Sequence, residues 1–344
     1  MRVVIAGYYG YRNWGDEGSL AALLQGVPHE ATTVLSGDPV FTQQTYGVRA
    51  VPRMALRAVR QAIRESDALI LGGGSLLQDA TSLRSLLYYL ALIRWGLSAH
   101  GRVLLVGQGI GPLYRPLSRW LTGAMLRKVP FLSVRDADSA QRLRSLGVEQ
   151  AQVDADLTWV LEAQPMPIGF NADARWVGVA PRPWRDAPVA EVMVAFCRQL
   201  HAEGFRTMLI PMQESQDRPL CEAIAAASKA FVLPAPTHPA QLLSVTRSLW
   251  GVVAMRLHGA IFAASQGTPV LCVSYDPKVD ALATQLQAPR VGLEAISVDL
   301  PHVWRAFVAQ RDALKVQTEQ RVLPLRNAAE ALLQRVKAAL SQAG

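Results

Sequence analysis

The segment MRLHG, residues 255–259, places an arginine and a histidine two positions apart, directly after an apolar run. At such a strand-to-helix junction both side chains can face one ligand. Histidine exchanges protons near neutral pH, and arginine can hold a carboxylate or a phosphate beside it. We therefore take His258 and Arg256 as the candidate catalytic residues. A histidine that merely caps the start of the helix is the alternative.

Arg135, in the segment SVRDADS (133–139), stands where another short apolar run ends. Arginine prefers planar oxyanions that it can bind through two hydrogen bonds, so phosphate or carboxylate ligands are the first expectation. Of the two acidic residues that follow, either Asp136 or Asp138 is better explained as the cap of the next helix.

Three glycine-rich segments each follow a short apolar run in the first half of the chain. Glycines let the backbone turn sharply and approach a ligand, and backbone amides grouped in such turns attract oxyanions. The segments are GYYGYRNWGDE (7–17), LGGGSLLQD (71–79) and GQGIGP (107–112). The first matches neither GxGxxG nor GxxxxGK[ST], so it predicts no dinucleotide or Walker-type site. Ordinary turns, with Asp16 as a helix N-cap in the first segment, are the alternative.

The elements that must position these residues form an alternating pattern. Short β-branched runs alternate with amphipathic stretches, which is typical of parallel sheets flanked by helices. The expected strands are 2–6, 33–36, 68–71, 103–107, 131–134, 152–153, 176–180, 206–210, 231–233, 251–254 and 270–273. The expected helices are 18–24, 55–65, 82–98, 118–127, 136–146, 189–203, 219–227, 239–247, 257–266 and 317–340.

A segment with prolines and a glycine, 163–174, interrupts the alternation and predicts a linker. The expected organisation is an N-terminal Rossmann-like domain over 1–162, the linker, a C-terminal Rossmann-like domain over 175–316, and a C-terminal helix over 317–344. The fold class is therefore α/β, with two doubly wound domains. Such domains are expected to face a cleft to which the carboxyl ends of both sets of strands point.

Composition excludes several classes of protein. The 344 residues carry 35 Lys and Arg against 27 Asp and Glu, a net charge of +8 that is spread over both halves. No RNA-binding aromatic signature, zinc finger or lysine-rich arm accompanies this charge, so we expect no nucleic-acid partner. The start lacks the pattern of a signal peptide, and the most apolar helical stretch, 83–97, is too short and too charged to span a membrane. We expect a soluble, cytoplasmic protein.

Metal and disulfide chemistry are not expected either. Cys197, Cys221 and Cys272 show no CxxC or Cys/His spacing, which excludes a disulfide framework and a zinc ribbon. Asp154 and Asp156 place two carboxylates on one side of a strand end, which is too few for a metal ion without a third ligand.

Four arginines recur at helical spacing after a proline: Arg53, Arg57, Arg60 and Arg64. A solvated helix face explains this spacing most simply. Contact with an anionic membrane surface or a lipid-linked phosphate is the alternative.

The order of these segments along the chain is more specific than any one of them. Together with DADLTW (154–159) and RLHGAIFAASQGTPVLCVSYDPKV (256–279), they resemble the polysaccharide pyruvyl transferase family, with the CsaB-like branch as its nearest type. The resemblance runs from Gly7 to about Asp280. It implies a GT-B-like fold of two Rossmann-type domains.

The implied reaction moves the enolpyruvyl part of phosphoenolpyruvate onto a sugar, forms a pyruvate ketal and releases phosphate. Phosphoenolpyruvate is then a co-substrate, and no cofactor is expected. In this branch the implied acceptor is an N-acetylmannosamine residue of a lipid-linked secondary cell-wall polysaccharide. Such pyruvylated polymers are similar to those that anchor S-layer proteins through their SLH domains. The positive charge and a lipid-linked acceptor together imply peripheral contact with the cytoplasmic face of the membrane.

By position, the resemblance assigns phosphoenolpyruvate to Arg135 and to Arg256, Leu257 and His258. Our hypothesis is that Arg182, at a strand end of the second domain, assists. We further expect His258 as imidazolium to protonate the methylene carbon, after which one acceptor hydroxyl attacks, phosphate leaves, and the second hydroxyl closes the ketal. The acceptor sugar is expected at the loops of the first domain, on Gly10, Asn13, Gly15, Asp16, Gly73, Gly74, Ser75, Gln78, Asp79 and Gln108.

Two other functions fit parts of the pattern. A GT-B glycosyltransferase that uses a nucleotide-sugar would share the fold, because a fold does not determine a function. A non-enzymatic sensor of an acidic metabolite would bind phosphoenolpyruvate without releasing phosphate.

Overall fold

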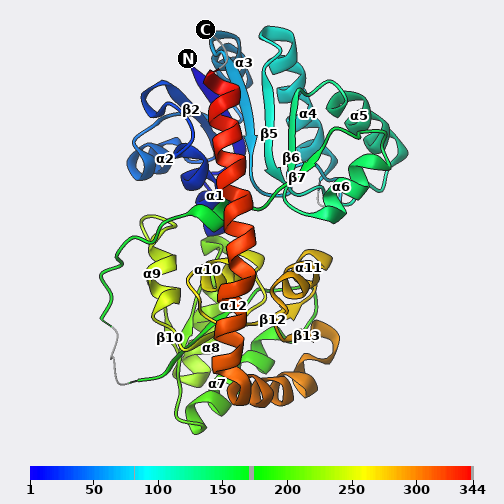
Figure 1. Cartoon of the computed structure of the whole chain (residues 1–344). Helices are drawn as coiled ribbons and strands as arrows, with labels where there is room; N and C mark the ends of the chain where they lie inside the picture. The colour runs from blue at the N-terminus through cyan, green and yellow to red at the C-terminus, as the bar shows by residue number, and fades with distance from the viewer. Residues whose placement is uncertain (81, 170–173, 342–344) are drawn as a thin grey trace. The chain divides into compact units, whose positions relative to one another are not determined.

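The computed structural model describes residues 1–80, 82–169 and 174–341 (Figure 1). The chain divides into two compact units. Unit 1 comprises residues 1–161 and 325–344, and unit 2 comprises residues 162–324. Each unit has its own parallel sheet and hydrophobic core. The fold class is therefore α/β with two doubly wound sheets, as predicted.

The sheet of unit 1 has the strand order β3-β2-β1-β4-β5-β6-β7. Its strands are β1 (Val3–Tyr9), β2 (Thr32–Ser36), β3 (Arg49–Pro52), β4 (Ala68–Gly72), β5 (Val103–Gln108), β6 (Phe131–Val134) and β7 (Gln152–Val153). All of them pair in parallel. The order reverses between β1 and β4, so the loops that follow these two strands lie where a doubly wound sheet binds its ligands.

The helices of unit 1 are α1 (Trp14–Leu24), α2 (Pro39–Tyr46), α3 (Leu56–Glu65), α4 (Leu83–Ala99), α5 (Pro116–Leu126) and α6 (Ala137–Arg144), with the short η1 (His29–Ala31) and η2 (Leu157–Val160). Helices α3 to α6 share one core with the strands, in which Val59, Ile63, Ile93 and Leu143 are fully buried. Apolar residues three and four apart on these helices supply that face.

Unit 2 has a second parallel sheet, ordered β10-β9-β8-β11-β12-β13. Its strands are β8 (Trp176–Ala180), β9 (Arg206–Leu209), β10 (Phe231–Val232), β11 (Gly251–Ala254), β12 (Val270–Ser274) and β13 (Arg290–Gly292). Its helices are α7 (Val189–Ala202), α8 (Glu214–Ser228), α9 (Gln241–Arg247), α10 (Leu257–Ser265) and α11 (Pro277–Leu286), with the short η3 (Leu293–Ala295). Trp304 and Phe307 stack at 5.3 Å between ring centroids and fill part of the core.

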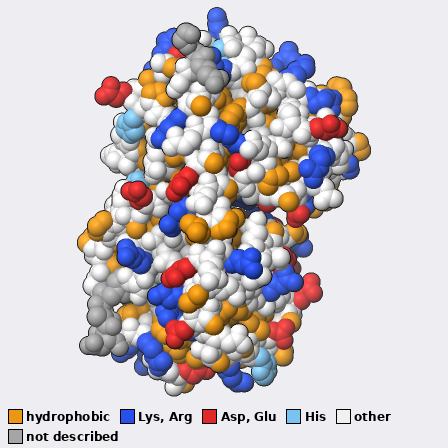
Figure 2. All heavy atoms as spheres, in the orientation of Figure 1, with side chains coloured by type: hydrophobic (Ala, Val, Ile, Leu, Met, Phe, Trp, Pro, Cys, Tyr) orange, Lys and Arg blue, Asp and Glu red, His pale blue; other side chains and the backbone are white. Residues whose placement is uncertain are grey.

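Helix α12 (Ile296–Ser341) contributes residues to both units. It presents charged and apolar side chains to solvent on the face shown in Figure 2. Val316 and Leu323 are among its exposed residues. Among the described residues, no helix is long and apolar enough to cross a membrane.

All eleven expected strands are present, but two edge strands and two helices were not predicted. The missed strands, β3 and β13, are short and carry an arginine or a proline instead of an apolar alternation. Helix α2 is rich in polar residues. Helix α11 has clear start signals, because Asp276 caps it and Pro277 is its first residue, and these could have been recognised.

Several boundaries differ from the prediction. Helix α8 begins at Glu214, upstream of Pro219, and α12 begins at Ile296 and runs on through Pro301 and Pro324. The N-cap of α1 is Asn13, so the alternative in which Asp16 caps this helix is wrong. Asp136 does cap α6, because its carboxylate accepts a hydrogen bond from the Ser139 amide at 2.7 Å. Of the expected linker, 163–169 and 174 form no helix or strand, and 170–173 lie outside the described residues.

The glycine-rich loop after β1 is held by a buried glutamate. Glu17 is fully buried and its Oε1 accepts hydrogen bonds from the amides of Gly10, at 2.8 Å, and Tyr11, at 3.3 Å. Its Oε2 accepts from the Tyr46 hydroxyl at 2.9 Å. Gly10 has φ +79°, and a Cβ there would lie 2.4 Å from the Asp38 amide nitrogen, so only glycine fits. Burial raises the pKa of Glu17 to about 7, although these hydrogen bonds act in the opposite direction.

We predict that Glu17 makes the chain less stable as pH rises. Between its ordinary pKa and about 7, the folded chain keeps a proton on Glu17 that the unfolded chain releases, so stability falls across this range. The upper limit of the effect is about 3 kcal/mol. Replacing Glu17 with glutamine keeps an acceptor for the Gly10 amide and removes the titration.

The measurement is urea unfolding at about pH 5 and about pH 8. The midpoint of the unmodified chain should fall relative to that of Glu17→Gln as pH rises. The exposed Glu65→Gln serves as the control and should follow the unmodified chain. An equal pH dependence in the chain and in Glu17→Gln would contradict the assignment.

Candidate functional site

In unit 2, the register of the sheet brings the sequence-predicted residues together. Ala254 of β11 pairs with Ala180 of β8 on one side and with Cys272 of β12 on the other. Arg182 and Arg256 each lie two residues beyond this paired row, at the carboxyl ends of neighbouring strands. The strands therefore deliver both arginines to the same edge of the sheet.

Arg256 is clamped by a buried aspartate of α8. Its Nε donates to Asp217 Oδ2 at 2.9 Å, and its Nη2 donates to Asp217 Oδ1 at 2.5 Å. Asp217 is fully buried and Arg256 is 9% exposed. Nη2 also donates to Gln216 Oε1 at 3.2 Å. The paired carboxylate fixes the orientation of the guanidinium and balances its charge.

Arg182 is held differently, by aromatic side chains. Its Nη1 donates to the Tyr275 hydroxyl at 2.6 Å, and its guanidinium carbon lies 5.1 Å from the ring centroids of both Trp184 and Tyr275. Within the described part of the chain, Arg182 forms no ion pair with a carboxylate, and its buried Nε has no hydrogen-bond partner. Among the described residues, the charge of Arg182 is therefore not balanced by a carboxylate.

Tyr275 links the two arginines electrostatically. Burial raises the pKa of its hydroxyl, whereas the charges of Arg182 and Arg256 act in the opposite direction. The net shift is upward, so Tyr275 is protonated at neutral pH and its oxygen accepts the Arg182 hydrogen bond as a neutral group.

His258 is the second residue of α10, and Arg256 is the N-cap of this helix. The alternative that His258 caps the helix is therefore wrong. Its imidazole is partly exposed, with its ring centroid 6.3 Å from that of Phe262, while Leu257 beside it is buried. No side chain caps the first amides of α10 from the N-cap position. This end of the helix combines a proton-exchanging group with amides that attract anions.

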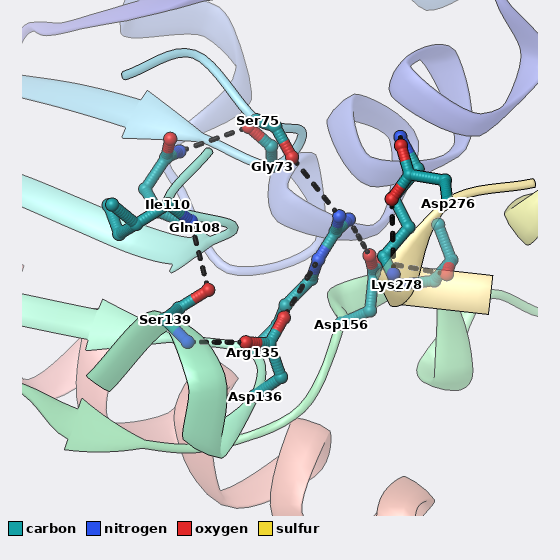
Figure 3. Close-up of polar contacts among 11 residues, drawn as sticks. Gly73, Ser75, Gln108, Ile110, Arg135, Asp136, Ser139, Asp156, Asp276 and Lys278 are labelled. Atoms are coloured by element: carbon teal, nitrogen blue, oxygen red, sulfur yellow. Dashed lines mark hydrogen bonds and ion pairs between the residues drawn. The ribbon is translucent and has the colours of Figure 1, made fainter. Parts of the chain in front are cut away.

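In unit 1, Arg135 connects three of the predicted loops (Figure 3). Its Nη1 donates to Asp156 Oδ2 at 3.0 Å, and its Nη2 donates to the Ser75 hydroxyl at 3.3 Å. A Cβ at Gly109 would lie 2.9 Å from Nη2, so this glycine makes room for the arginine. Like Arg256, Arg135 is thus an almost buried arginine paired with a buried aspartate.

Gln108 and two glycines shape the loop after β4. The Gln108 amide donates to the carbonyl oxygens of Leu71 at 3.1 Å and Gly73 at 3.0 Å, and its Oε1 is buried without a partner among the described residues (Figure 3). Gly74 has φ +71°, and a Cβ there would lie 2.7 Å from Asp16 Oδ1. The first two glycine-rich segments therefore meet at Asp16 and Gly74.

The other predicted acceptor residues divide into buried and accessible groups. Asp79 is buried and accepts hydrogen bonds from the amides of Tyr114, at 2.7 Å, and Arg115, at 3.0 Å. Burial opposes its ionisation, but these donors outweigh burial and lower its pKa. Gly10, Gly15 and Gln108 are also buried, whereas the partly exposed side chains are those of Asn13, Asp16, Ser75 and Gln78.

Sequence reasoning missed Arg53 as a site residue. Arg57, Arg60 and Arg64 are exposed, which fits both a solvated face and a membrane contact, but the expectation of a solvated face is wrong for Arg53, which is 8% exposed. Arg53 donates to the Gly7 carbonyl at 3.2 Å and to the Tyr89 hydroxyl at 3.1 Å.

The Arg53 guanidinium lies within 6.0 Å of four tyrosine rings, those of Tyr8, Tyr11, Tyr88 and Tyr89. No carboxylate pairs with it in the described residues. The tyrosine pairs in the sequence were the signal that could have revealed it. Arg53 therefore brings a positive charge to the glycine-rich loop after β1.

The two aspartates at the end of β7 both pair with arginines. Asp156 binds Arg135, and Asp154 accepts from Arg335 at 2.6 Å and from the Ser133 hydroxyl at 2.7 Å. Over residues 1–80, 82–169 and 174–341, no group of three or more His, Cys, Asp or Glu is arranged to hold a metal ion.

Comparison with solved structures shows which fold the two units form. The chain resembles MnaA of S. aureus in complex with UDP (TM-score 0.71, 12% identity, 99% of this chain and 97% of that chain). It also resembles a putative UDP-N-acetylglucosamine 2-epimerase of Listeria monocytogenes (0.67, 13%, 100% and 98%) and Anabaena Alr3699/HepE in complex with UDP (0.64, 10%, 99% and 100%). These are GT-B folds of glycosyltransferases and epimerases, and the likeness shows the fold alone.

No curated protein matches the chain. The model of the family described as polysaccharide pyruvyl transferase matches residues 17–277, which include the glycine-rich segments after β4 and β5 and the residues around Arg135, Arg182, Arg256 and His258. This match covers well over half of the chain. The chain belongs to the polysaccharide pyruvyl transferase family.

Proposed function

We propose that the chain transfers the enolpyruvyl group of phosphoenolpyruvate to a sugar, forming a pyruvate ketal and releasing phosphate. Membership of the family supports pyruvyl transfer. The observation that carries the donor assignment is the edge of the unit 2 sheet, where Arg182, Arg256 and His258 follow two neighbouring strands. Phosphoenolpyruvate carries a carboxylate and a phosphate, and arginines are suited to both.

The two arginines have different roles in this proposal. Arg182, whose charge is not balanced by a carboxylate in the described residues, supplies the net attraction for the trianionic donor. The guanidinium of Arg256 is fixed and its charge balanced by Asp217, so Arg256 orients phosphoenolpyruvate more than it attracts it. Arg135 is fixed in the same way in unit 1, and its contact with phosphoenolpyruvate stays a prediction.

The imidazolium of His258 donates a proton to the methylene carbon, which becomes a methyl group. The C2 atom then carries oxocarbenium character and is attacked by one sugar hydroxyl. The C2–O bond to phosphate breaks, and a second hydroxyl attacks C2. The two hydroxyls lose two protons, of which one restores His258 and one leaves with phosphate, so the step is balanced.

The acceptor is proposed to bind the loops of unit 1. Asn13, Asp16, Ser75 and Gln78 are partly exposed there and offer amide, carboxylate and hydroxyl groups that match sugar hydroxyls. In keeping with the CsaB-like branch, we propose an N-acetylmannosamine residue of a lipid-linked secondary cell-wall polysaccharide as the acceptor. The product would then serve S-layer anchoring, and the reaction would take place in the cytoplasm at the inner face of the membrane.

A second candidate is a glycosyltransferase that uses a nucleotide-sugar. The likeness of fold to structures solved with UDP, and to a glycosyltransferase of Rickettsia africae, favours it. This candidate predicts that UDP-sugars bind or turn over.

We predict phosphate release from phosphoenolpyruvate that depends on one acceptor. The measurement compares acceptors containing N-acetylmannosamine, glucose or galactose, each with phosphoenolpyruvate and, in parallel, with UDP-sugars. Release with a single acceptor class supports ketal transfer and names that class. Turnover of a UDP-sugar without phosphate release from phosphoenolpyruvate would replace the proposal with the glycosyltransferase.

We predict that His258→Ala lowers the rate of phosphate release by about 10²- to 10⁴-fold, because a positioned general acid contributes that much. Binding of phosphoenolpyruvate should persist, since the arginines remain. The exposed His302→Ala is the matched control and should keep the full rate. A His258→Ala variant that retains most of its turnover would remove His258 from the chemistry.

We predict that Arg182→Gln impairs binding of phosphoenolpyruvate, whereas Arg256→Gln lowers the stability of the chain. Loss of Arg182 should raise KM for phosphoenolpyruvate by roughly 10- to 100-fold and leave stability nearly unchanged, because a charge-assisted hydrogen bond to the ligand is lost. Loss of Arg256 leaves Asp217 as a buried, unpaired charge and should destabilise the chain by about 3–5 kcal/mol.

Steady-state kinetics and urea unfolding of the two variants measure this difference. The exposed Arg185→Gln, in the same loop as Arg182, is the control and should change neither quantity. Equal loss of stability in Arg182→Gln and Arg256→Gln would contradict the division of roles.

A further inference from the structure

Within the first half of the chain, the positive charge lies mainly in one segment. Residues 51–130 contain 11 of the 35 Lys and Arg but only 3 of the 27 Asp and Glu. The excess of eight equals the net charge of the whole chain, +8, so the remaining residues carry 24 charges of each sign. The segment includes α3, α4 and α5 of unit 1.

Most of these basic side chains are exposed, whereas the acids are largely engaged. Asp79 is buried against two backbone amides, and Asp67 is partly buried and accepts from the Arg2 amide at 2.6 Å. Only Glu65 is a fully exposed acid in this segment. The exposed bases are Arg57, Arg60, Arg64, Arg84, Arg94, Arg115, Arg119, Arg127 and Lys128.

The same segment exposes unusually large apolar side chains. Tyr114, Met54 and Trp120, with exposed fractions of 73%, 72% and 65%, are the three most exposed large hydrophobic residues in the described chain. Leu117, Leu56 and Leu87 are exposed as well. Burying any of them against another surface would be favourable in water.

The three helices are neighbours on one face of the sheet. Helix α4 packs against both α3 and α5, and their buried sides enter the same core (Figure 1). Leu117 and Trp120 are three residues apart on α5, and Leu56 and Arg60 are four apart on α3, so each pair lies on one side of its helix. At the upper right edge of Figure 2, over α5, blue basic and orange apolar side chains stand next to one another.

We propose that the outer face of α3, α4 and α5 is a docking surface for an anionic lipid bilayer. The arginines would contact headgroup phosphates, and the side chains of Met54, Leu117 and Trp120 would enter the interface between headgroups and acyl chains. Basic residues interspersed with exposed aromatic and aliphatic ones are the pattern of helices that lie on membranes. This surface would bring the chain to the membrane-linked acceptor proposed above, but none of its residues belongs to either set of site loops, so membrane binding can be tested apart from the reaction.

A lipid surface fits these residues better than a protein partner does. The centre of a protein–protein interface is depleted of charged residues. Here the arginines lie on the same helix turns as the apolar side chains, Arg57 beside Leu56 and Arg119 beside Trp120. In a bilayer, the arginines can pair with headgroup phosphates while the apolar side chains enter the layer beneath. An apolar protein surface would leave the guanidinium groups unpaired.

The test is co-sedimentation of the full chain with vesicles of phosphatidylcholine alone and of phosphatidylcholine mixed with phosphatidylglycerol. We expect binding to the anionic vesicles that weakens with added salt, and little binding to the neutral ones. Each basic residue near an anionic surface contributes on the order of fivefold to partitioning. The combined variant Arg57→Gln, Arg60→Gln, Arg64→Gln should therefore bind about 100-fold more weakly.

The apolar contribution is tested with Leu117→Ser and Trp120→Ser, which should weaken binding even at low salt. Both residues are exposed, so the variants should fold. Lys315→Gln and Val316→Ser, exposed residues of α12 in unit 2, are the matched controls and should bind as the unmodified chain does. The proposal is overturned if the chain stays in the supernatant with anionic vesicles, as a protein-docking surface would, or if the α3 and α5 variants bind like the controls.

Discussion

Each unit fixes an arginine at the end of a strand with a buried aspartate, and the geometry of both sets of loops depends on these two pairs. Arg135 is held by Asp156 and Arg256 by Asp217, in each case with little exposure to solvent. A buried ion pair costs desolvation, and removing one partner leaves an unpaired charge that destabilises a protein strongly. The pairs therefore restrict how their loops can be arranged, and they also limit what these arginines can do for a ligand, because their charge is already balanced.

The positive charge that attracts an anion must then come from elsewhere. In the site proposed in unit 2, Arg182 would supply it, because among the described residues its guanidinium is held by Tyr275 and Trp184 and not by a carboxylate. In unit 1, Arg53 follows the edge strand β3 and lies among four tyrosines beside the loop that Glu17 orders. Aromatic rings stabilise a guanidinium without neutralising it, so its donors stay available to an oxyanion. In the proposed sites, the arginines paired with aspartates would therefore orient an anionic ligand, and the arginines held by aromatic rings would attract it.

The sequence was sufficient to predict the elements that carry the site and the positions of Arg135, Arg182, Arg256 and His258 at strand ends. Strand–helix alternation has strong periodicity, and the residues after a parallel strand always emerge at the same edge. The sequence did not predict which residues pair with these arginines. Asp217 lies 39 residues before Arg256 on another helix, and nothing local marks it.

The same limit explains the error at Arg53 and the omission of Glu17. The helical spacing of four arginines indicated a solvated face, but Arg53 precedes the helix, where packing against the tyrosines overrides the pattern. Glu17 stands in a motif that was recognised, next to the selected Asp16, and only burial distinguishes the two. In both cases tertiary contacts, which a linear pattern does not contain, decide the role of the side chain.

The most direct test of the central claim is calorimetric titration of the unmodified chain, without any acceptor, with phosphoenolpyruvate and with UDP. If the strand-end arginines of unit 2 are a site for a carboxylate and a phosphate, phosphoenolpyruvate should bind with an affinity that falls as salt is added, and UDP should bind much more weakly. Tight binding of UDP with no detectable heat from phosphoenolpyruvate would contradict the account.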